Sequence, residues 1–199
     1  MAYNQPQSQP MGYTTSPNLA LNSAAPTPRL LHIYSKGMTH RHAEILDSDK
    51  QTPLYRIQVN SGGLFGSKPH VTVVNAASNA LVGTVTFHSM SRKIDLTINE
   101  QPTTLSKSGI FTSVHEFRSS ALAGSLKWKR DGLFSGGNML FIDEKEQLFA
   151  RFQASRSAMK KERKFELSPG VGGVLMDEIV VSGIAMVELM RRAAAAGAG

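Results

Sequence analysis

Residues 174–192 read VLMDEIVVSGIAMVELMRR, and this stretch decides the fold. Between Ile179 and Val187 it carries no charged residue, and only Ser182 and Gly183 interrupt the apolar side chains. No polar stripe recurs at helical spacing, so a helix here would be apolar all round and would need burial on every side. The sequence therefore predicts one helix that the rest of the chain encloses.

Charged residues bound this stretch at both ends. Asp177 and Glu178 open it and Arg191 and Arg192 close it, an order that complements the helix dipole. A membrane span needs about 20 apolar residues, and the two acids together with Glu188 leave a shorter run. We therefore expect burial within protein and no transmembrane span.

The composition describes a basic protein without thiols. The chain has 199 residues, with 22 Lys and Arg against 15 Asp and Glu, for a net charge of +7. This charge favours acidic partners and leaves anionic lipid, acidic protein and nucleic acid open. The chain has no cysteine, which excludes disulfides and thiol chemistry and fits a reducing compartment. With no secretory signal pattern at the N-terminus, we expect a cytoplasmic protein, with peripheral attachment to a membrane as an extension.

The termini differ in composition from the middle of the chain. Residues 1–28 contain five prolines and no charge, and such a segment cannot bury enough apolar surface to offset its ordering entropy. We expect a disordered tail over 1–28, a folded domain over 29–192 and an Ala/Gly tail over 193–199.

From residue 29 onward, short runs rich in Val, Ile, Leu, Phe and Thr alternate with turn residues, which is the pattern of consecutive strands in an all-β domain. Eleven candidate strands follow one another, at 30–34, 43–46, 54–59, 70–75, 81–88, 93–98, 109–117, 125–129, 139–143, 147–152 and 164–168.

Three segments of the first half recur in the second half in the same order. YRIQVNSGGLF (55–65) matches GSLKWKRDGLF (124–134), LVGTV (81–85) matches LFARF (148–152), and RKIDLT (92–97) matches RKFELS (163–168). Chance similarity among β-rich segments is the alternative, but the shared order favours an internal repeat of two half-sheets.

Two half-sheets and one apolar helix predict a mainly β fold, a closed antiparallel barrel of about twelve strands around a central C-terminal helix at 174–192. Such a barrel is too wide for its own side chains to fill, so a central helix completes the core while closure removes the exposed edges. Ser182, Gly183 and Ala185 would be small so that the strands can approach the helix.

Three strings carry a family resemblance: LKWKRDGLFSGGNMLFIDEKEQLFARFQASR (126–156), KFELSPG (164–170) and MDEIVVSGIAMVELMRR (176–192). The chain resembles the tubby C-terminal-like superfamily, which includes the tubby domain, the phospholipid scramblases and the plant LURP-one-related proteins, and it is most similar to small uncharacterised fungal members. The resemblance implies a twelve-stranded barrel around a hydrophobic helix, and the plant and fungal members carry no established enzymatic activity that it would transfer. The tubby domain binds phosphoinositide head groups through surface Lys and Arg, but no segment here carries those positions over. The scramblases are palmitoylated on cysteine, which this chain lacks.

Two basic clusters are candidate lipid sites. The run RSAMKKERK contributes Arg156, Lys160, Lys161, Arg163 and Lys164 between two predicted strands, where they could meet phosphate groups; a solvated hairpin loop is the alternative. Lys127, Lys129 and Arg130 surround Trp128. Strand alternation turns Lys127 and Lys129 outward and Trp128 into the core.

Other patterns predict no site. His40 and His42 could share one face of a strand, but no third metal ligand has the required spacing. SGGLFGSK (61–68) resembles a phosphate-binding loop without its spacing. The basic residues lack interleaved exposed aromatics, which disfavours nucleic acid. No catalytic motif is present, so we expect neither an enzyme nor a cofactor.

The sequence thus predicts a non-enzymatic tubby-like domain that binds anionic, phosphoinositide-like head groups at a membrane surface through the two basic clusters. The alternative is a protein-interaction scaffold with no lipid ligand.

Overall fold

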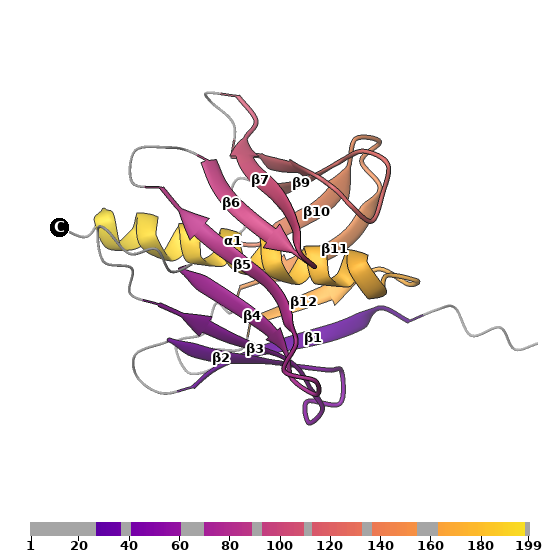
Figure 1. The fold of residues 1–199 in the computed structure, drawn as a ribbon. Helices are drawn as coiled ribbons and strands as arrows, with labels where there is room; N and C mark the ends of the chain where they lie inside the picture. The colour runs from indigo at the N-terminus through magenta and orange to yellow at the C-terminus, as the bar shows by residue number, and fades with distance from the viewer. Residues whose placement is uncertain are drawn as a thin grey trace, which may run out of the picture.

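Strands that form a barrel make up most of the described chain, and one long helix follows them at the C-terminal end (Figure 1). The computed structural model describes residues 27–36, 41–60, 70–88, 93–109, 113–132, 137–154 and 163–197. In order these form β1 (Arg29–Lys36), β2 (His42–Leu46), β3 (Pro53–Val59), β4 (Val71–Asn75), β5 (Leu81–Phe87), β6 (Lys93–Ile98), β7 (Gln101–Lys107), β8 (His115–Arg118), β9 (Ser125–Arg130), β10 (Met139–Asp143), β11 (Leu148–Gln153), β12 (Arg163–Leu167) and α1 (Gly173–Ala196).

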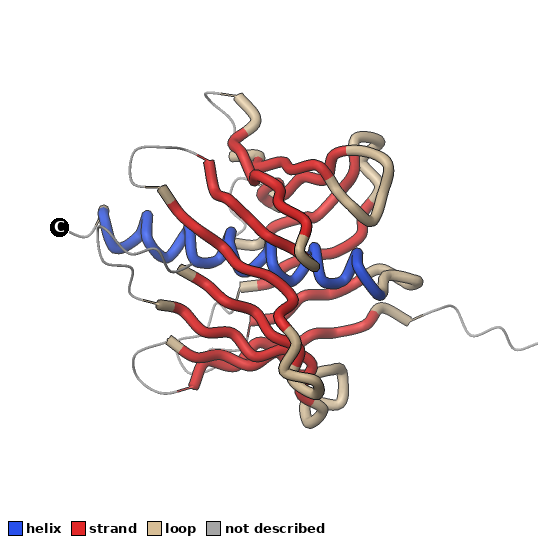
Figure 2. The backbone as a smooth tube through the Cα atoms, viewed as in Figure 1, coloured by secondary structure: helices blue, strands red, loops and turns tan. Residues whose placement is uncertain are grey.

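The barrel is closed and antiparallel. Each strand pairs with the next one along the chain, and β1 pairs with β12, with Leu31 opposite Phe165, to complete the ring. Figure 2 shows the strands surrounding α1, which runs through the barrel. The predicted fold class is therefore confirmed, with twelve strands among the described residues.

The internal repeat corresponds to half a turn of the barrel. The matched segments lie on β3 and β9, on β5 and β11, and on β6 and β12, so the members of each pair are six strands apart in a ring of twelve. Equivalent side chains point the same way: Ile94 on β6 and Phe165 on β12 are both buried. The two halves of the repeat therefore form opposite sides of one barrel.

One strand was missed by the sequence prediction. β7 contains Pro102, a residue that argues against a strand because it cannot donate a ladder hydrogen bond. The strand follows a two-residue loop, Asn99–Glu100, in which both residues have positive φ. That combination is typical of tight hairpins. The predicted strand at 109–117 is also displaced, since β8 begins only at His115.

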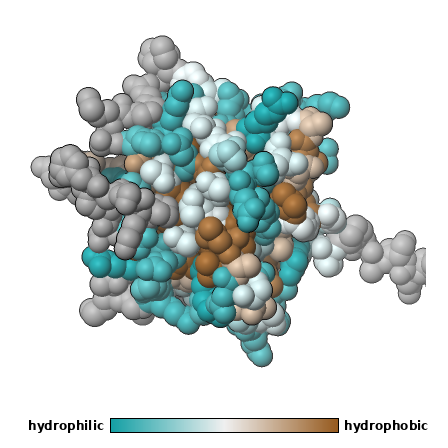
Figure 3. Space-filling model, in the orientation of Figure 1, coloured by the Kyte–Doolittle hydropathy of each residue, from teal (hydrophilic) through white to brown (hydrophobic). Residues whose placement is uncertain are grey.

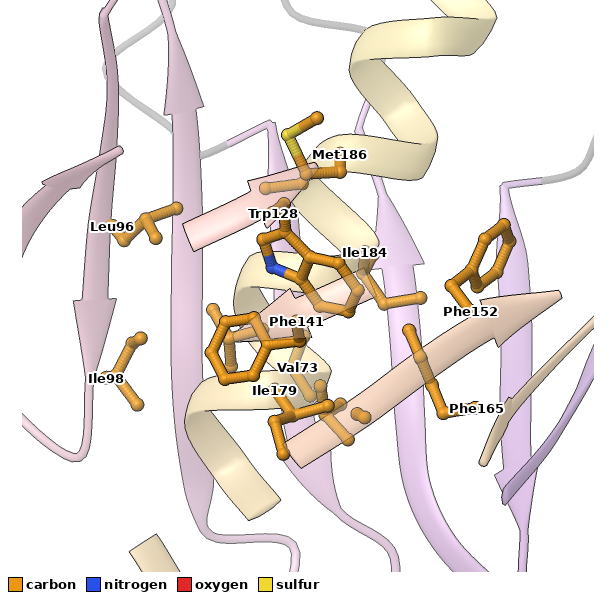
Figure 4. Packing of buried hydrophobic residues seen from close by; sticks show 14 of the residues in the cluster. Val73, Leu96, Ile98, Trp128, Phe141, Phe152, Phe165, Ile179, Ile184 and Met186 are labelled. Carbon is orange, nitrogen blue, oxygen red and sulfur yellow. The ribbon is translucent and has the colours of Figure 1, made fainter. Parts of the chain in front are cut away.

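The core lies between α1 and the walls. From Ile179 to Met186 every residue of α1 is buried, as the absence of a polar stripe predicts. Trp128 and Phe165 pack against this helix from different strands, and Figure 4 shows the large buried side chains gathered around it. Val187 is only half-buried, and Glu188 after it is buried again.

Close approach of strands and helix explains the small residues of the core. A Cβ added at Gly183 would lie 2.6 Å from Cε1 of Phe165, and one at Gly83 on β5 would lie 2.8 Å from Cγ2 of Val181. No side chain fits at either position without displacing its neighbours. The expectation that Gly183 is small so that strands can approach is confirmed.

The ends of α1 differ from the prediction. The helix runs from Gly173 to Ala196 and does not end at Arg192, so most of the predicted Ala/Gly tail is helical. Its first turn holds no acid and its last turn no base. The predicted match between Asp177 and Glu178 and the helix dipole is therefore wrong, because the helix extends beyond the charged residues at both ends.

The two acids instead fix the helix to the barrel wall. Asp177 accepts hydrogen bonds from Tyr55 Oη at 2.7 Å and Asn99 Nδ2 at 3.0 Å. Glu178 is 1 % exposed and accepts from Ser119 Oγ at 2.6 Å and from the backbone N–H of Ser120 at 2.6 Å. A buried carboxylate without such donors would be costly, so these bonds set the depth of α1 in the barrel.

Candidate functional site: a pocket at the mouth of the barrel

A cavity lies at the end of the barrel where the C-terminal half of α1 emerges, and this end of the barrel is on the left in Figure 1. Its volume is about 790 Å³. At this end β5, β7 and β9 finish and β6, β8 and β10 begin, at Phe87, Lys107, Arg130, Lys93, His115 and Met139, all of which line the cavity. We call this cavity the mouth pocket.

The floor and one wall of the mouth pocket are apolar. Among the described residues, six large apolar side chains line it: Phe87, Ile94 and Met139 from strands, and Met186, Leu189 and Met190 from α1. Methionine is flexible and polarizable, so a wall rich in methionine adapts to ligands of different shape. Met139 and Met186 are buried, which places them on the side of the pocket towards the core.

Cations surround this apolar surface. We call Lys93, Lys107, Arg130 and Arg192 the cationic rim. His88 and His115 also line the pocket. Among the described residues that line it, none is acidic. Strand alternation explains two of the positions. Leu105 on β7 and Trp128 on β9 are buried inward, so Lys107 and Arg130, two residues further on, point the same way at the mouth.

Arg130 is the member of the rim with the fewest interactions. It lies opposite Met139 in the β9–β10 ladder, and within the described residues no hydrogen bond or ion pair to its guanidinium is found. An arginine fork presents several donors in a plane that matches carboxylate or phosphate oxygens. Arg130 is therefore placed to bind an anion that enters the pocket.

The two outward lysines of the same strand share one carboxylate. Lys127 Nζ lies 3.4 Å from Glu146 Oε1, and Lys129 Nζ pairs with the other oxygen of that carboxylate. The hydrogen bond from Lys129 is the main cause of the lowered pKa of Glu146. Both lysines face outward, as alternation predicts, while Trp128 is fully buried. Lys127 and Lys129 therefore share one counter-ion on the outer face, whereas Arg130 at the mouth has no counter-ion among the described residues.

His115 lines the mouth pocket and carries one buried ring nitrogen without a hydrogen bond. Its Nδ1 is buried and has no hydrogen-bond partner. Burial lowers the pKa of His115, and the nearby Lys107 charge acts in the same direction, although a backbone contact with Ser113 opposes them. Burial and the Lys107 charge therefore both favour the neutral form of the His115 imidazole.

Arg192 is held in place by a neighbouring carboxylate. Its guanidinium centre lies 4.2 Å from the centroid of the Phe87 ring, and its Nε donates to Glu188 Oε1 at 2.9 Å. Arg191 donates to the same carboxylate at 2.7 and 2.8 Å. Burial favours a higher pKa for Glu188, but the bonds from Arg191 and Arg192 outweigh it and keep the pKa below its usual range.

Arg163 completes this group. It takes the inward position of β12, two residues before the buried Phe165. Burial lowers the pKa of Arg163, and the charge of Glu188 opposes that shift. One carboxylate thus faces the positive charges of Arg163, Arg191 and Arg192, and this side of the mouth keeps a net positive charge.

The structure divides the predicted basic residues into three groups. Arg130 and Arg163 lie inward at the mouth, and Lys127, Lys129 and Lys164 lie on outward positions of β9 and β12. The remaining predicted residues, Arg156, Lys160 and Lys161, lie outside the described residues. The outer wall of the barrel mixes hydrophilic and hydrophobic residues in the view of Figure 3.

Sequence reasoning missed Lys93, Lys107, His115 and Arg192 as site residues. They come from four different elements, β6, β7, β8 and α1, and no local motif connects them. Lys107 could have been found from the alternation in TTLSK (103–107), had β7 been recognised as a strand.

Two other predicted patterns are only partly described. His42 is exposed at the start of β2, whereas His40 and the segment 61–68 lie outside the described residues. In the described part of the chain, no group of three or more His, Cys, Asp or Glu side chains could hold a metal ion. Nor does that part contain a helix with the length and hydropathy that crossing a membrane requires.

Together, the fold and the pocket define a class of protein: an antiparallel β-barrel filled by its own C-terminal helix, with an apolar, basic-rimmed pocket at one mouth. The chain belongs to a family of unknown function (DUF6593), which matches residues 38–193. A search of curated proteins found no match.

Among solved structures, the barrel is similar to the X-ray structure of a protein from Arabidopsis thaliana. The TM-score is 0.50 at 12 % sequence identity, and the similarity covers 82 % of this chain and 90 % of the other. At this identity the similarity concerns the fold alone.

Proposed function

We propose that this protein is a non-enzymatic, tubby-like barrel that binds anionic lipid head groups at a membrane surface, with the mouth of the barrel facing the lipid. The observation that carries the proposal is the cationic rim: four Lys and Arg side chains line one pocket that no described acid enters. Exposed phosphate groups on anionic lipids bind such clusters of donors.

The tubby-like part of the proposal is supported by architecture. A twelve-stranded closed barrel with a buried C-terminal helix is what the resemblance implies, and the Arabidopsis structure shares the fold over most of both chains. A phosphoinositide-like head group, with several phosphates, would suit several cations around one opening.

The mouth suits this role better than the outer face of β9. Lys127 and Lys129 share the Glu146 carboxylate, so an anion there would compete with that carboxylate. Arg130 has no such competitor among the described residues. Of the residues that the sequence suggested on β9, the proposal therefore keeps Arg130 and sets aside Lys127 and Lys129.

Liposome co-sedimentation tests this proposal. The full chain is mixed with neutral phosphatidylcholine vesicles, or with vesicles that also contain phosphatidylserine or a phosphoinositide, at two salt concentrations. We expect pelleting only with anionic vesicles, and less at high salt, because surface charge is screened within about 10 Å at 0.1 M.

Two matched variants locate the binding face. Each cation near an anionic surface contributes about 1 kcal/mol, so Lys107→Gln with Arg130→Gln should weaken binding about fivefold per charge removed. The control pair, Lys127→Gln with Lys129→Gln on the adjacent outward face, should bind as the wild type does. Equal loss in both pairs, or salt-independent pelleting, would overturn the proposal. Absence of pelleting with every vesicle would favour the protein-scaffold alternative.

A further inference from the structure

We propose that the mouth pocket takes up the hydrocarbon chain of a single-chain anionic lipid, a fatty acid or a lysophospholipid, whose acidic head group lies at the cationic rim. This inference deepens the proposed function and rests on it for the acidic head group. The added claim is that a single lipid molecule inserts its chain into the mouth of the barrel, beyond contact between the protein and a membrane surface.

Pocket size fits a chain better than a head group alone. Pockets that enclose small organic ligands measure about 300–1,000 Å³, and the mouth pocket, at about 790 Å³, lies in that range. An inositol phosphate or a phosphate ion would need only the rim. The apolar interior below the rim would then be left in contact with water.

The distribution of polarity matches an amphiphile. Ile94, Met139 and Met186 line the pocket and are buried, so its inner part belongs to the hydrophobic core. Lys93 and Arg130 line it as well and are exposed. A ligand with an apolar chain and an acidic end would place its chain against the methionines and its charge among the cations.

Charge complementarity selects an acid over a neutral lipid. The pocket lining contains four Lys and Arg side chains and no described acid. These cations would attract the negative charge of an acidic head group, and a neutral lipid of the same chain length would lack that attraction.

Trp128 provides a built-in reporter for chain entry. It is the only tryptophan in the sequence. It is fully buried and lies opposite His115 in the β8–β9 ladder, so a chain in the pocket lies close to its ring. Bromine atoms on a hydrocarbon chain quench tryptophan fluorescence at short range, and buried indole is protected from water-soluble quenchers.

The test titrates the full chain with dibromostearic acid below its micelle concentration. We expect saturable quenching by the brominated acid, none by stearic acid, and competition between the two. The brominated alcohol of the same length should bind at least tenfold more weakly. In a series of shorter acids, competition should strengthen about fourfold for each added methylene group, equivalent to about 0.8 kcal/mol.

Two helix variants separate pocket occupancy from general surface adsorption. Ala193 lines the pocket and is exposed at the end of α1, so Ala193→Phe narrows the pocket without disturbing the core. It should weaken binding of the acid at least tenfold. Ala195→Phe, on the same exposed helix end but outside the pocket lining, should leave binding unchanged. Equal effects of the two variants, or quenching that never saturates, would overturn the inference.

The two proposals fail in different ways. Vesicle pelleting without saturable quenching would leave the proposed function standing and overturn chain uptake. Saturable quenching without vesicle pelleting would support chain uptake and overturn binding at the membrane surface.

Discussion

The indole Nε1 of Trp128 on β9 donates a hydrogen bond to Ser182 Oγ on α1 at 2.9 Å, and both residues are fully buried. Ser182 Oγ in turn donates to the backbone carbonyl of Glu178 at 2.5 Å. This short chain of bonds joins the barrel wall to the middle of the helix and orients the largest side chain of the core.

Ser182→Ala should therefore destabilise the fold. The variant leaves the Trp128 N–H buried without an acceptor, at a cost of about 1–3 kcal/mol. Urea unfolding followed by circular dichroism measures the loss. The control, Ser106→Ala, changes a half-buried serine at an outward position of β7 and should alter stability by less than about 0.5 kcal/mol. Equal effects of both variants would show that the bond to Trp128 contributes little.

Gly183→Ala should destabilise the fold, although it adds only one methyl group. The new methyl carbon would lie 2.6 Å from Cε1 and 2.7 Å from Cζ of Phe165, and overpacking of this kind costs about 1–3 kcal/mol or more. Thermal unfolding gives the comparison with Gly197→Ala, where the nearest atom, Ala193 O, is 3.6 Å away. An unchanged midpoint for Gly183→Ala would mean that strands and helix can separate at little cost.

Ile184→Asp should unfold the domain. Ile184 is 6 % exposed inside the barrel, and an unpaired carboxylate there would lack both water and a counter-ion. The far-ultraviolet circular dichroism and the dispersion of an NMR spectrum report folding directly. Ile184→Val removes one methylene group and should cost only about 0.5–1.5 kcal/mol. A well-folded Ile184→Asp protein would contradict the central position of the helix.

The ion pairs that Glu188 forms with Arg191 and Arg192 should make the stability of the fold depend on pH. Because its pKa is lowered in the folded state, the stability that Glu188 contributes is present above its unfolded pKa, near 4.5. This contribution is lost as the pH falls through the lower folded value. Glu188→Gln should lose about 1–2 kcal/mol at pH 7, a value reduced because Arg191 and Arg192 are partly exposed. Chemical unfolding at a series of pH values from 7 downward tests this: the difference in stability between wild type and variant should be largest at pH 7 and should shrink as the pH falls below about 4.5.

The architecture was predictable because it follows from burial. A helix with no polar stripe between Ile179 and Val187 must be buried on every side. The recurring segments indicated two similar half-sheets that could surround it. The details that failed depend on tertiary partners. Asp177 and Glu178 resemble helix-capping acids in sequence, but in the structure they accept hydrogen bonds from residues such as Tyr55 and Ser119, which are remote along the chain.

The candidate site was only partly predictable for a similar reason. The sequence places Arg130 beside Lys127 and Lys129, and alternation alone shows that it points the other way. Its companions at the mouth, Lys107 and Arg192, are brought to it by closure of the barrel and by the depth of α1. Neither closure nor depth is encoded in a local motif.

The central claim is that anionic lipid binds at the mouth of the barrel and not on its outer wall. It is tested most directly by NMR chemical-shift mapping of the full chain with a soluble short-chain phosphoinositide. The account predicts shifts concentrated at Lys107, His115 and Arg130, with Lys127 and Lys129 unaffected. Shifts confined to the outward residues of β9, or no saturable shifts at all, would contradict it.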